Sequence, residues 1–477
     1  MHGPIEVAAT GNSVEAEKTT YVWGIAIVAA LGGLLFGYDW VVIGGAREFY
    51  EIYFRLTSAN LVGWANSCAL VGCLAGSLIA GSLTDRFGRK PVLLVSALLF
   101  AISSIFTGWA YTFASFIAWR IAGGVAIGLS SNVSPLYIAE VSPSSLRGRL
   151  VSLNQFAIVV GILLAQLVNW LVAKPIQEHA SADILLASWN VQYGWRWMFT
   201  ALVIPSAIFA FAALWIPESP RWLAARGRQG DAQHTLARVG GDAYAQAELA
   251  NIDRTLSLEH KVATSLWQEL AVPAVRRILL VGIALAVLQQ WTGINVLFNY
   301  AAEVYRNAGY GANDIFLNIV ITGTINLVFT IAAVFLIDRV GRRKLMIFGC
   351  AGIAVSHVLC AMAYRAGMGG IAVLALTLSA IGCYALTLAP VTWVLISEIF
   401  PQRVRAQGVS IAVSALWIAS FALTYSFPIL NRRLGTAWVF AGYGAICILG
   451  SILVATSVTE TKGRSLEEIE AGVLQGR

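Results

Sequence analysis

Long apolar runs separated by short charged turns make up most of this chain. Most of the runs are near or above the roughly 20 residues with which an α-helix crosses a bilayer. The pattern therefore predicts an all-α membrane protein with twelve spanning helices, near residues 21–45, 60–83, 91–110, 114–138, 150–172, 196–216, 278–303, 314–337, 345–364, 370–397, 406–426 and 436–457.

One long polar segment, residues 217–277, interrupts the apolar runs and divides them six and six. Its Arg226-Gly227-Arg228 turn and the stretch 242–260 predict short amphipathic helices on the membrane surface. We therefore divide the chain into a tail, a first bundle, a linker, a second bundle and a second tail, at 1–20, 21–216, 217–277, 278–457 and 458–477.

Charged residues make up only 12% of the chain, whereas a soluble domain carries about 25%. The net charge of +7 could suggest nucleic acid, but most Lys and Arg residues fall in alternate loops. Basic residues concentrate in the cytoplasmic loops of membrane proteins. This pattern places both termini in the cytoplasm. We expect a monomeric, multi-pass plasma membrane protein in contact with the lipid bilayer, with no nucleic-acid partner.

Three charged signatures occur twice, in the same order, at ends of predicted helices. The loop 81–90, which contains Asp85-Arg86-Phe87-Gly88-Arg89-Lys90, returns at 338–344 as Asp338-Arg339-Val340-Gly341-Arg342-Arg343-Lys344. A Glu seven residues before an Arg occurs at Glu140 and Arg147, and again at Glu398 and Arg405. The run 217–221, with Glu218 and Arg221, is matched by 460–464. This repetition predicts an internal duplication, and hence two pseudo-symmetric six-helix bundles.

Acids and bases that repeat together at one membrane face suit a latch between the bundles. Carboxylate and guanidinium groups form strong charge-assisted bonds, and helix ends attract side chains of suitable charge. Plain topological anchoring by positive charge is the alternative, but it does not explain why the acids repeat with the bases. The residues assigned to this gating network are Gly81, Asp85, Arg86, Arg89, Glu140, Arg147, Glu218, Arg221, Asp338, Arg339, Arg342, Glu398 and Arg405.

Asp39 and Arg120 are ionisable residues inside predicted helices, where charge is costly and usually functional. Each lies six residues from the outer end of its predicted helix, so both should sit about 9 Å deep and can form an ion pair. A static salt bridge is one interpretation. The other is proton coupling, in which Asp39 binds a proton from outside, releases Arg120 and makes closure depend on protonation.

Amide side chains mark the seventh predicted helix. A three-three-four spacing, typical of one helical face, relates Gln289, Thr292, Asn295 and Asn299, and Gln290 lies beside them. Amides donate and accept hydrogen bonds, as sugar hydroxyls do. Hydrogen bonding between helices is the alternative use, but the clustering favours an uncharged polyol as ligand. Further candidate contacts are polar and aromatic residues of other helices: Phe36, Gln155, Asn326, Trp393 and Trp417.

The doubled loop, the run 217–223 and the run 289–295 resemble the sugar porter family of the major facilitator superfamily. The resemblance covers roughly residues 21–470 and implies two six-helix bundles that rock about a substrate held near the midplane. It implies that the charged network stabilises the outward-facing state, and that the amide and Trp residues above contact sugar. An Asp at the position of Asp39 is typical of proton-coupled members.

The sequence departs from the family pattern at four places. No acid precedes Pro205, although some proton-coupled members carry one there. Leu416 stands where an Asn or Gln is common, Ala389 replaces a Gly, and Trp291 replaces a smaller residue. These departures leave the preferred sugar open.

The sequence thus predicts a secondary transporter that imports a monosaccharide, a hexose or a pentose, with a proton across the bacterial inner membrane. A passive facilitator that uses the same pocket and a membrane sugar sensor stay open as alternatives. No nucleophile–base–acid set, metal-ligand spacing or phosphate loop occurs in the sequence. We therefore expect neither an enzyme nor a bound metal or cofactor.

Overall fold

Helices form the regular structure in the computed structural model of this chain, which describes residues 16–175, 182–262, 272–400, 404–460 and 462. The first half contains α1 (Ala16–Tyr53), α2 (Ala59–Phe87), α3 (Arg89–Gly108), α4 (Phe113–Val141), α5 (Arg147–Val172), α6 (Ala182–Ala187), the π-helical turn η1 (Asn190–Gly194), α7 (Trp195–Thr200) and α8 (Val203–Ala213). The polar segment contains α9 (Pro220–Ala225), α10 (Gln229–Gly240) and α11 (Asp242–Val262).

The second half contains α13 (Pro273–Trp291), α14 (Ile294–Asn299), α15 (Ala301–Asn307), α16 (Ala312–Val340), α17 (Arg342–Arg365), α18 (Ile371–Leu386), α19 (Leu388–Glu398), α20 (Arg405–Leu434) and α21 (Thr436–Ser457). Among the described residues, twelve helical segments are long and apolar enough to cross a membrane. This confirms the number predicted from the sequence. The tails predicted at 1–20 and 458–477 lie mostly outside the described residues.

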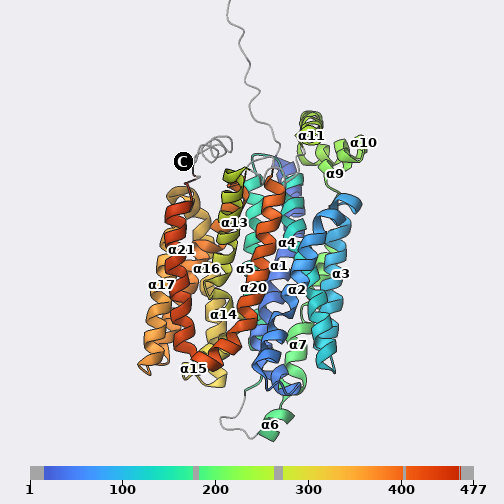
Figure 1. The fold of residues 1–477 in the computed structure, drawn as a ribbon. Coiled ribbons are helices and arrows are strands. Elements are labelled where there is room, and N and C mark those ends of the chain that lie inside the picture. Colours follow the sequence, from blue (N-terminus) through green and yellow to red (C-terminus); the bar gives the residue numbers. More distant parts are fainter. Residues whose placement is uncertain (1–15, 176–181, 263–271, 401–403, 461, 463–477) are drawn as a thin grey trace, which may run out of the picture.

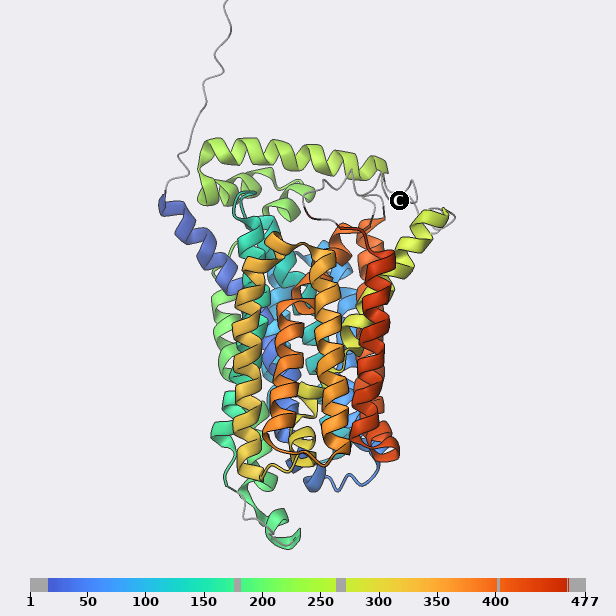
Figure 2. The same ribbon diagram turned by 90° about the vertical axis from the view of Figure 1, so that its left-hand side faces the viewer.

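The long helices run side by side and give the molecule two distinct ends (Figure 1). Helices α9, α10 and α11 lie at one end, which we call the linker end, and α11 extends across it (Figure 2). Helices α6 and α15 lie at the opposite end, which we call the distal end (Figure 1). Most spanning helices are longer than the predicted apolar runs, and several of them continue into charged residues at one end.

Within each half, the helices pack mainly on one another. In the first half α2 packs on α4 and α1 on α5, and in the second half α17 packs on α21 and α13 on α20. The halves meet mainly where α2 contacts α20 and where α5 contacts α16. Helices α5 and α16 therefore face each other across the boundary between the halves.

Small residues bring α2 and α4 into backbone contact. Gly72 and Gly76 of α2 lie against Gly124 and Gly128 of α4, and a Cβ at any of these positions would overlap the backbone of the other helix. Two facing Gly-x-x-x-Gly pairs of this kind let membrane helices approach closely and gain van der Waals contact. The abundance of Gly in the sequence thus has a direct packing function here.

Three predicted helices are broken in the structure. The predicted helix 278–303 is interrupted at Thr292 and Gly293, where Gly293 has a φ of +83°, a conformation that favours glycine. The predicted helices 196–216 and 370–397 are interrupted near Ala201 and at Thr387. Each of these two breaks lies shortly before a proline, Pro205 or Pro390, whose ring disrupts the preceding helical turn.

Candidate functional site

Asp39 of α1 and Arg120 of α4 form a buried ion pair inside the first half. Arg120 Nη1 lies 2.6 Å from Asp39 Oδ1, and both residues are 3% exposed. The Arg120 guanidinium also lies over the ring of Phe199, 5.3 Å from its centroid. The pairing predicted from the sequence is therefore present in the structure. The predicted end of the first helix near residue 45 is wrong, because α1 continues to Tyr53, and the equal depth of the two residues in the membrane stays a prediction.

The ion pair leaves one carboxylate oxygen available. Asp39 Oδ2 accepts no hydrogen bond from the described residues, and it lies close to Gly123, where an added Cβ would be 3.0 Å away. On the same helix, Phe36 and Trp40 point to the second half. Their rings lie 6.0 Å from Trp417 and 6.3 Å from Phe298, respectively. Helix α1 thus connects the ion pair to aromatic contacts between the halves.

The amides at the break between α13 and α14 bond to one another. Gln290 Nε2 donates to Gln289 Oε1 at 2.5 Å, and Asn295 Nδ2 donates to Gln290 Oε1. All three are buried. Because the helix is interrupted at Thr292 and Gly293, these side chains gather at a break and do not form the continuous helical stripe that the spacing predicted. Unwound backbone with polar side chains is typical of membrane proteins where it lines a cavity or is buried in protein.

The other predicted ligand contacts come from five helices, α1, α5, α16, α19 and α20. Asn326 of α16 is buried and Gln155 of α5 is half-buried. Trp417 of α20 is 4% exposed, and its Nε1 has no hydrogen-bond partner among the described residues. Trp393 of α19 is 37% exposed. Phe36 and Trp417, from different halves, bring their rings within 6.0 Å of each other.

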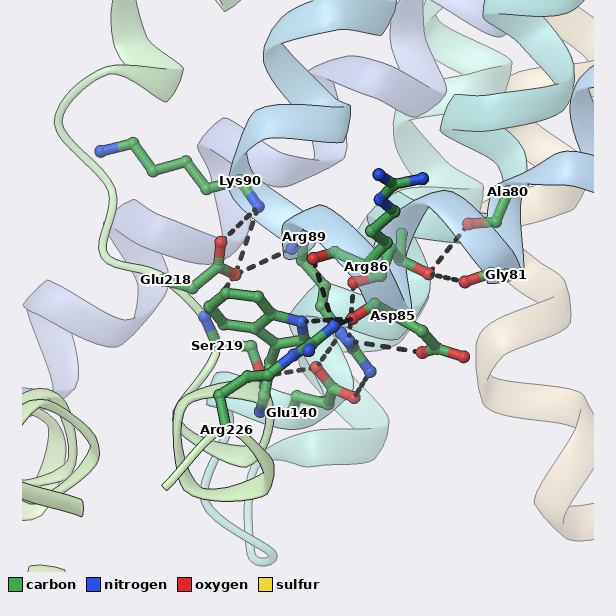
Figure 3. A network of polar contacts seen from close by, with 12 residues as sticks. Ala80, Gly81, Asp85, Arg86, Arg89, Lys90, Glu140, Glu218, Ser219 and Arg226 are labelled. Carbon is green, nitrogen blue, oxygen red and sulfur yellow. Dashed lines mark hydrogen bonds and ion pairs between the residues drawn. The ribbon is translucent and has the colours of Figure 1, made fainter. Parts of the chain in front are cut away.

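At the linker end of the first half, Arg89 joins two carboxylates (Figure 3). Arg89 Nε and Nη2 each donate to Glu140 at 2.9 Å, a bidentate bond. Glu218 Oε1 accepts from the backbone N–H of Arg89 at 2.9 Å, and Glu218 also accepts from Lys90 N at 3.2 Å. Ser219 Oγ donates to Glu140 Oε2 at 2.6 Å. Glu218 therefore caps the N-terminus of α3, where a carboxylate is favoured by the helix dipole.

The second half repeats this arrangement with other residues. Glu460 accepts from the backbone N–H groups of Arg342 at 2.9 Å and Arg343 at 3.2 Å, which caps α17. Arg342 Nη2 lies 3.7 Å from Glu398 Oε1. Gly88 and Gly341 precede the two capped helices with φ values of +99° and +101°. Glu218 and Glu460 lie where a Cβ on these glycines would be.

The remaining predicted network residues are held differently. Asp85 Oδ1 lies 3.7 Å from Arg89, while the carbonyl groups of Asp85 and Arg86 accept from Arg226. Arg405 donates to the Phe400 carbonyl, and the Arg339 carbonyl accepts from Lys462. Gly81 supplies a carbonyl to Thr84. The side chain of Asp338 lies outside the described part of the chain.

Arg147 is exposed at the start of α5 and lies near Tyr244 of α11. Burial and the nearby Glu248 raise the pKa of the Tyr244 hydroxyl to about 12, whereas Arg147 acts in the opposite direction.

At the distal end, charged residues pair across the two halves. Arg47 of α1 lies 2.6 Å from Glu303 of α15, and its guanidinium sits over the Tyr300 ring at 4.4 Å. Glu48 pairs with Arg306, and Arg432 of α20 donates to the carbonyl of Thr57 at 2.8 Å. Phe49 and Phe316 stack between α1 and α16. The distal end is thus closed by direct contact between the halves.

This geometry agrees with the similarity of the chain to known proteins. Residues 25–472 match the family described as sugar (and other) transporter. The chain belongs to this sugar transporter family. It is 36% identical to the D-xylose-proton symporter of Escherichia coli strain K12, over 95% of this chain and 96% of that protein. It is 38% identical to the arabinose-proton symporter of Bacillus subtilis strain 168, over 94% of each.

Solved structures of a relative have the same fold. The inward-open conformation of the xylose transporter XylE from E. coli matches with a TM-score of 0.83 and 34% identity, over 94% of this chain and 99% of that one. A partially occluded inward-open conformation of the same transporter matches with a TM-score of 0.82. The major facilitator fold predicted from the sequence is therefore confirmed.

Several residues that join or cap elements of this structure are not assigned a function in the sequence analysis. They are the charged residues Arg47, Glu48, Glu303 and Arg306, which join the halves at the distal end. The alternation of sign in Arg47-Glu48 and in Glu303 with Arg306 is a signal that could have suggested pairing. The capping role of Glu460 depends on backbone N–H groups, which a search for paired side chains does not detect.

Proposed function

We propose that this chain imports a monosaccharide, a hexose or a pentose, together with a proton, by alternating access between its two halves. The observation that carries the proposal is the buried Asp39–Arg120 pair on a helix that also contacts the second half. The names of the relatives, a D-xylose-proton symporter and an arabinose-proton symporter, support both the cargo and the coupling ion.

The sugar binds, in this proposal, at the break between α13 and α14. Gln289, Gln290 and Asn295 are buried there with no ionic side chain in their hydrogen-bonded chain, which suits a neutral ligand. Their amides can exchange these mutual bonds for bonds to sugar hydroxyls, because each amide both donates and accepts. Trp417 offers an indole N–H and an aromatic face, which suits the apolar face of a sugar ring. Phe36, Gln155, Asn326 and Trp393 complete the proposed set.

The proton binds Asp39. A proton from outside bonds to a carboxylate oxygen of Asp39, the carboxyl group becomes neutral, and its ion pair with Arg120 is lost. Helix α1 is then free to shift, and with it Phe36 and Trp40, which contact Trp417 and Phe298 of the other half. Release of the proton on the other side restores the ion pair. Sugar and proton thereby cross together.

The linker end is cytoplasmic in this proposal, and the structure corresponds to the inward-facing state in a bacterial inner membrane. Two observations support this assignment: the distal end is closed by ion pairs between the halves, and the inward-open relative matches with a TM-score of 0.83. The charged networks at the linker end would then bridge the halves only after that end closes, as the latch hypothesis requires.

Replacement of Asp39 by Asn tests the proposal most directly. The introduced amide cannot bind or release a proton, so uphill accumulation of sugar driven by a proton gradient should fall to the level without a gradient. Exchange of labelled for unlabelled sugar should persist. Asp183→Asn, a change of an exposed acid in α6, serves as the matched control and should leave accumulation intact. Unchanged accumulation in Asp39→Asn would show that Asp39 does not carry the proton and that Asp39–Arg120 is a static salt bridge. A wild type that exchanges sugar but never accumulates it uphill would identify a passive facilitator.

The cargo is tested with a panel of labelled sugars. Vesicles that contain the protein should take up at least one of xylose, arabinose, glucose, galactose and inositol, and an imposed inward proton gradient should raise the plateau. Binding of a sugar without uptake would favour the sensor. Neither uptake nor binding of any sugar would contradict the proposal.

A further inference from the structure

Gln166 of α5 is a buried amide that neither the ion pair nor the predicted sugar site uses. It is 1% exposed, and neither its Oε1 nor its Nε2 has a hydrogen-bond partner among the described residues. A buried amide that loses all its hydrogen bonds to water is costly, because each atom keeps its desolvation penalty. Because a Leu could fill the same space without that cost, a buried Gln at this position requires a functional explanation.

Gln166 lies on the same face of α5 as Gln155. The two are separated by eleven residues, which is about three helical turns, or about 16 Å along the axis. Because α5 begins at the linker end with Arg147 and ends at Val172, Gln166 is the more distal of the two. It therefore lies on the distal side of the proposed sugar site, on the face that already carries a predicted contact.

The Gln166 amide reaches across the boundary between the halves. Its Oε1 occupies the space that a Cβ on Gly323 of α16 would take. Gly323 is one turn from Asn326, another predicted sugar contact, and lies on its distal side because α16 begins distally at Ala312. The partnerless amide thus sits between α5 and α16, beside Gly323, about one turn from Asn326 and about three turns from Gln155.

A hydrogen bond between helices does not explain the presence of Gln166 in this conformation. Asn169, one turn further along α5, does form such a bond, because its Nδ2 donates to the Val42 carbonyl of α1 at 3.0 Å. That bond joins two helices of one half, which move together. Gln166 instead packs against the other half without a bond, and it is uncovered when the distal ends of α5 and α16 separate.

We propose that Gln166 forms a distal subsite that binds a hydroxyl group of the incoming sugar while the distal end is open. An amide offers one acceptor and two donors to a polyol. When the distal end closes, the amide packs against Gly323, loses this bond, and the sugar stays with Gln155 and Asn326. This inference rests on the proposed sugar transport, and it assigns to Gln166 a role that operates only from the distal side.

The test compares deoxy analogues of a transported sugar as external inhibitors of uptake. In wild-type right-side-out vesicles, removal of the hydroxyl that contacts Gln166 should weaken inhibition about five- to tenfold. In Gln166→Leu the parent sugar should bind more weakly from outside, and that analogue should now match the parent within about twofold. Analogues modified at other positions should keep their wild-type ratios. Inside-out vesicles should show the same inhibition pattern for both proteins.

Control variants separate this subsite from packing and conformational bias. Asn154→Leu removes another buried amide with a partnerless oxygen on α5, but one packed against Gly33 of its own half, and should preserve every analogue ratio. Gln166→Asn, which keeps the amide, covers the case in which the Leu variant does not fold. A uniform change for all analogues, or no change, would overturn the inference while leaving sugar transport by the wild type established. Absence of wild-type uptake would instead contradict the proposed function.

Discussion

At the distal end, Arg47 of the first half pairs with Glu303 of the second, whereas at the linker end Arg89 pairs with Glu140 of its own half. Both arginines are largely buried, with side chains 9% and 10% exposed. The same chemistry therefore has two different consequences. A pair between the halves must break when the halves rock, but a pair within one half can persist through the whole cycle.

This difference separates conformational control from stability. In the conformation described, Arg47–Glu303 and Glu48–Arg306 hold the distal end closed. Arg89–Glu140 and the Glu218 cap instead fix α3 against α4 and the start of the linker segment. We therefore expect substitutions at the two ends to change different measurable quantities.

The largest expected effect is on stability, from Glu140→Ala. It leaves the buried Arg89 guanidinium without its bidentate partner, which should cost about 3 kcal/mol of folding free energy. The measurement is the thermal unfolding midpoint of the purified protein. The control is Arg228→Ala, which breaks an ion pair whose two side chains are 57% and 56% exposed and should change stability by less than about 1 kcal/mol. Equal shifts in the two variants would show that Arg89–Glu140 does not stabilise the half.

The next effect is on the conformational equilibrium, from Glu303→Gln. It removes one of the two ion pairs that join the halves at the distal end, Arg47–Glu303, and should raise the open-distal population about thirtyfold, equal to about 2 kcal/mol. The readout is the labelling rate of Phe316→Cys by an impermeant maleimide, in a background without the six native cysteines. Phe316 is half-buried and stacks on Phe49 of the first half, so labelling of the thiol should become faster when the halves part. Asp314→Asn, an exposed acid on α16, should leave the rate unchanged, and a similar rate in both variants would argue against a distal gate.

The comparison also explains what the sequence could predict. The linker-end residues can be found from sequence because their signatures are repeated and lie within short segments. The distal pairs join α1 to α15, elements far apart in sequence, and neither Arg47 nor Glu303 belongs to a repeat. The apolar run of the first helix ends before Arg47, so the helix is predicted to end near residue 45, although α1 reaches Tyr53. The helix continues through Arg47 because this charge is paired.

At the candidate site, too, the sequence pattern identifies some residues, whereas other features are visible only in the packed structure. Composition places Asp39, Arg120 and the amides of residues 289–295 inside the membrane, and the structure brings the first two into contact. The break at Gly293 is not predicted because the polar residues on both sides of it keep a helical spacing within an otherwise apolar run. Gln166 is not predicted because only packing against Gly323 reveals that its amide has no partner among the described residues.

The smallest expected effect is on stability, from replacement of the repeated glycines at the linker end by Ala. Gly88→Ala and Gly341→Ala place a Cβ at a φ near +100° and against the capping carboxylates of Glu218 and Glu460. Each should cost about 1 kcal/mol, measured as a lower unfolding midpoint without faster labelling at the distal end.

Gly81 belongs to the same predicted network but lies inside α2 with nothing within 4 Å of a Cβ. Gly81→Ala should therefore stabilise the helix by up to about 1 kcal/mol. If Gly81→Ala were as destabilising as Gly88→Ala, Gly81 would have a contact in another conformation, as the latch hypothesis allows.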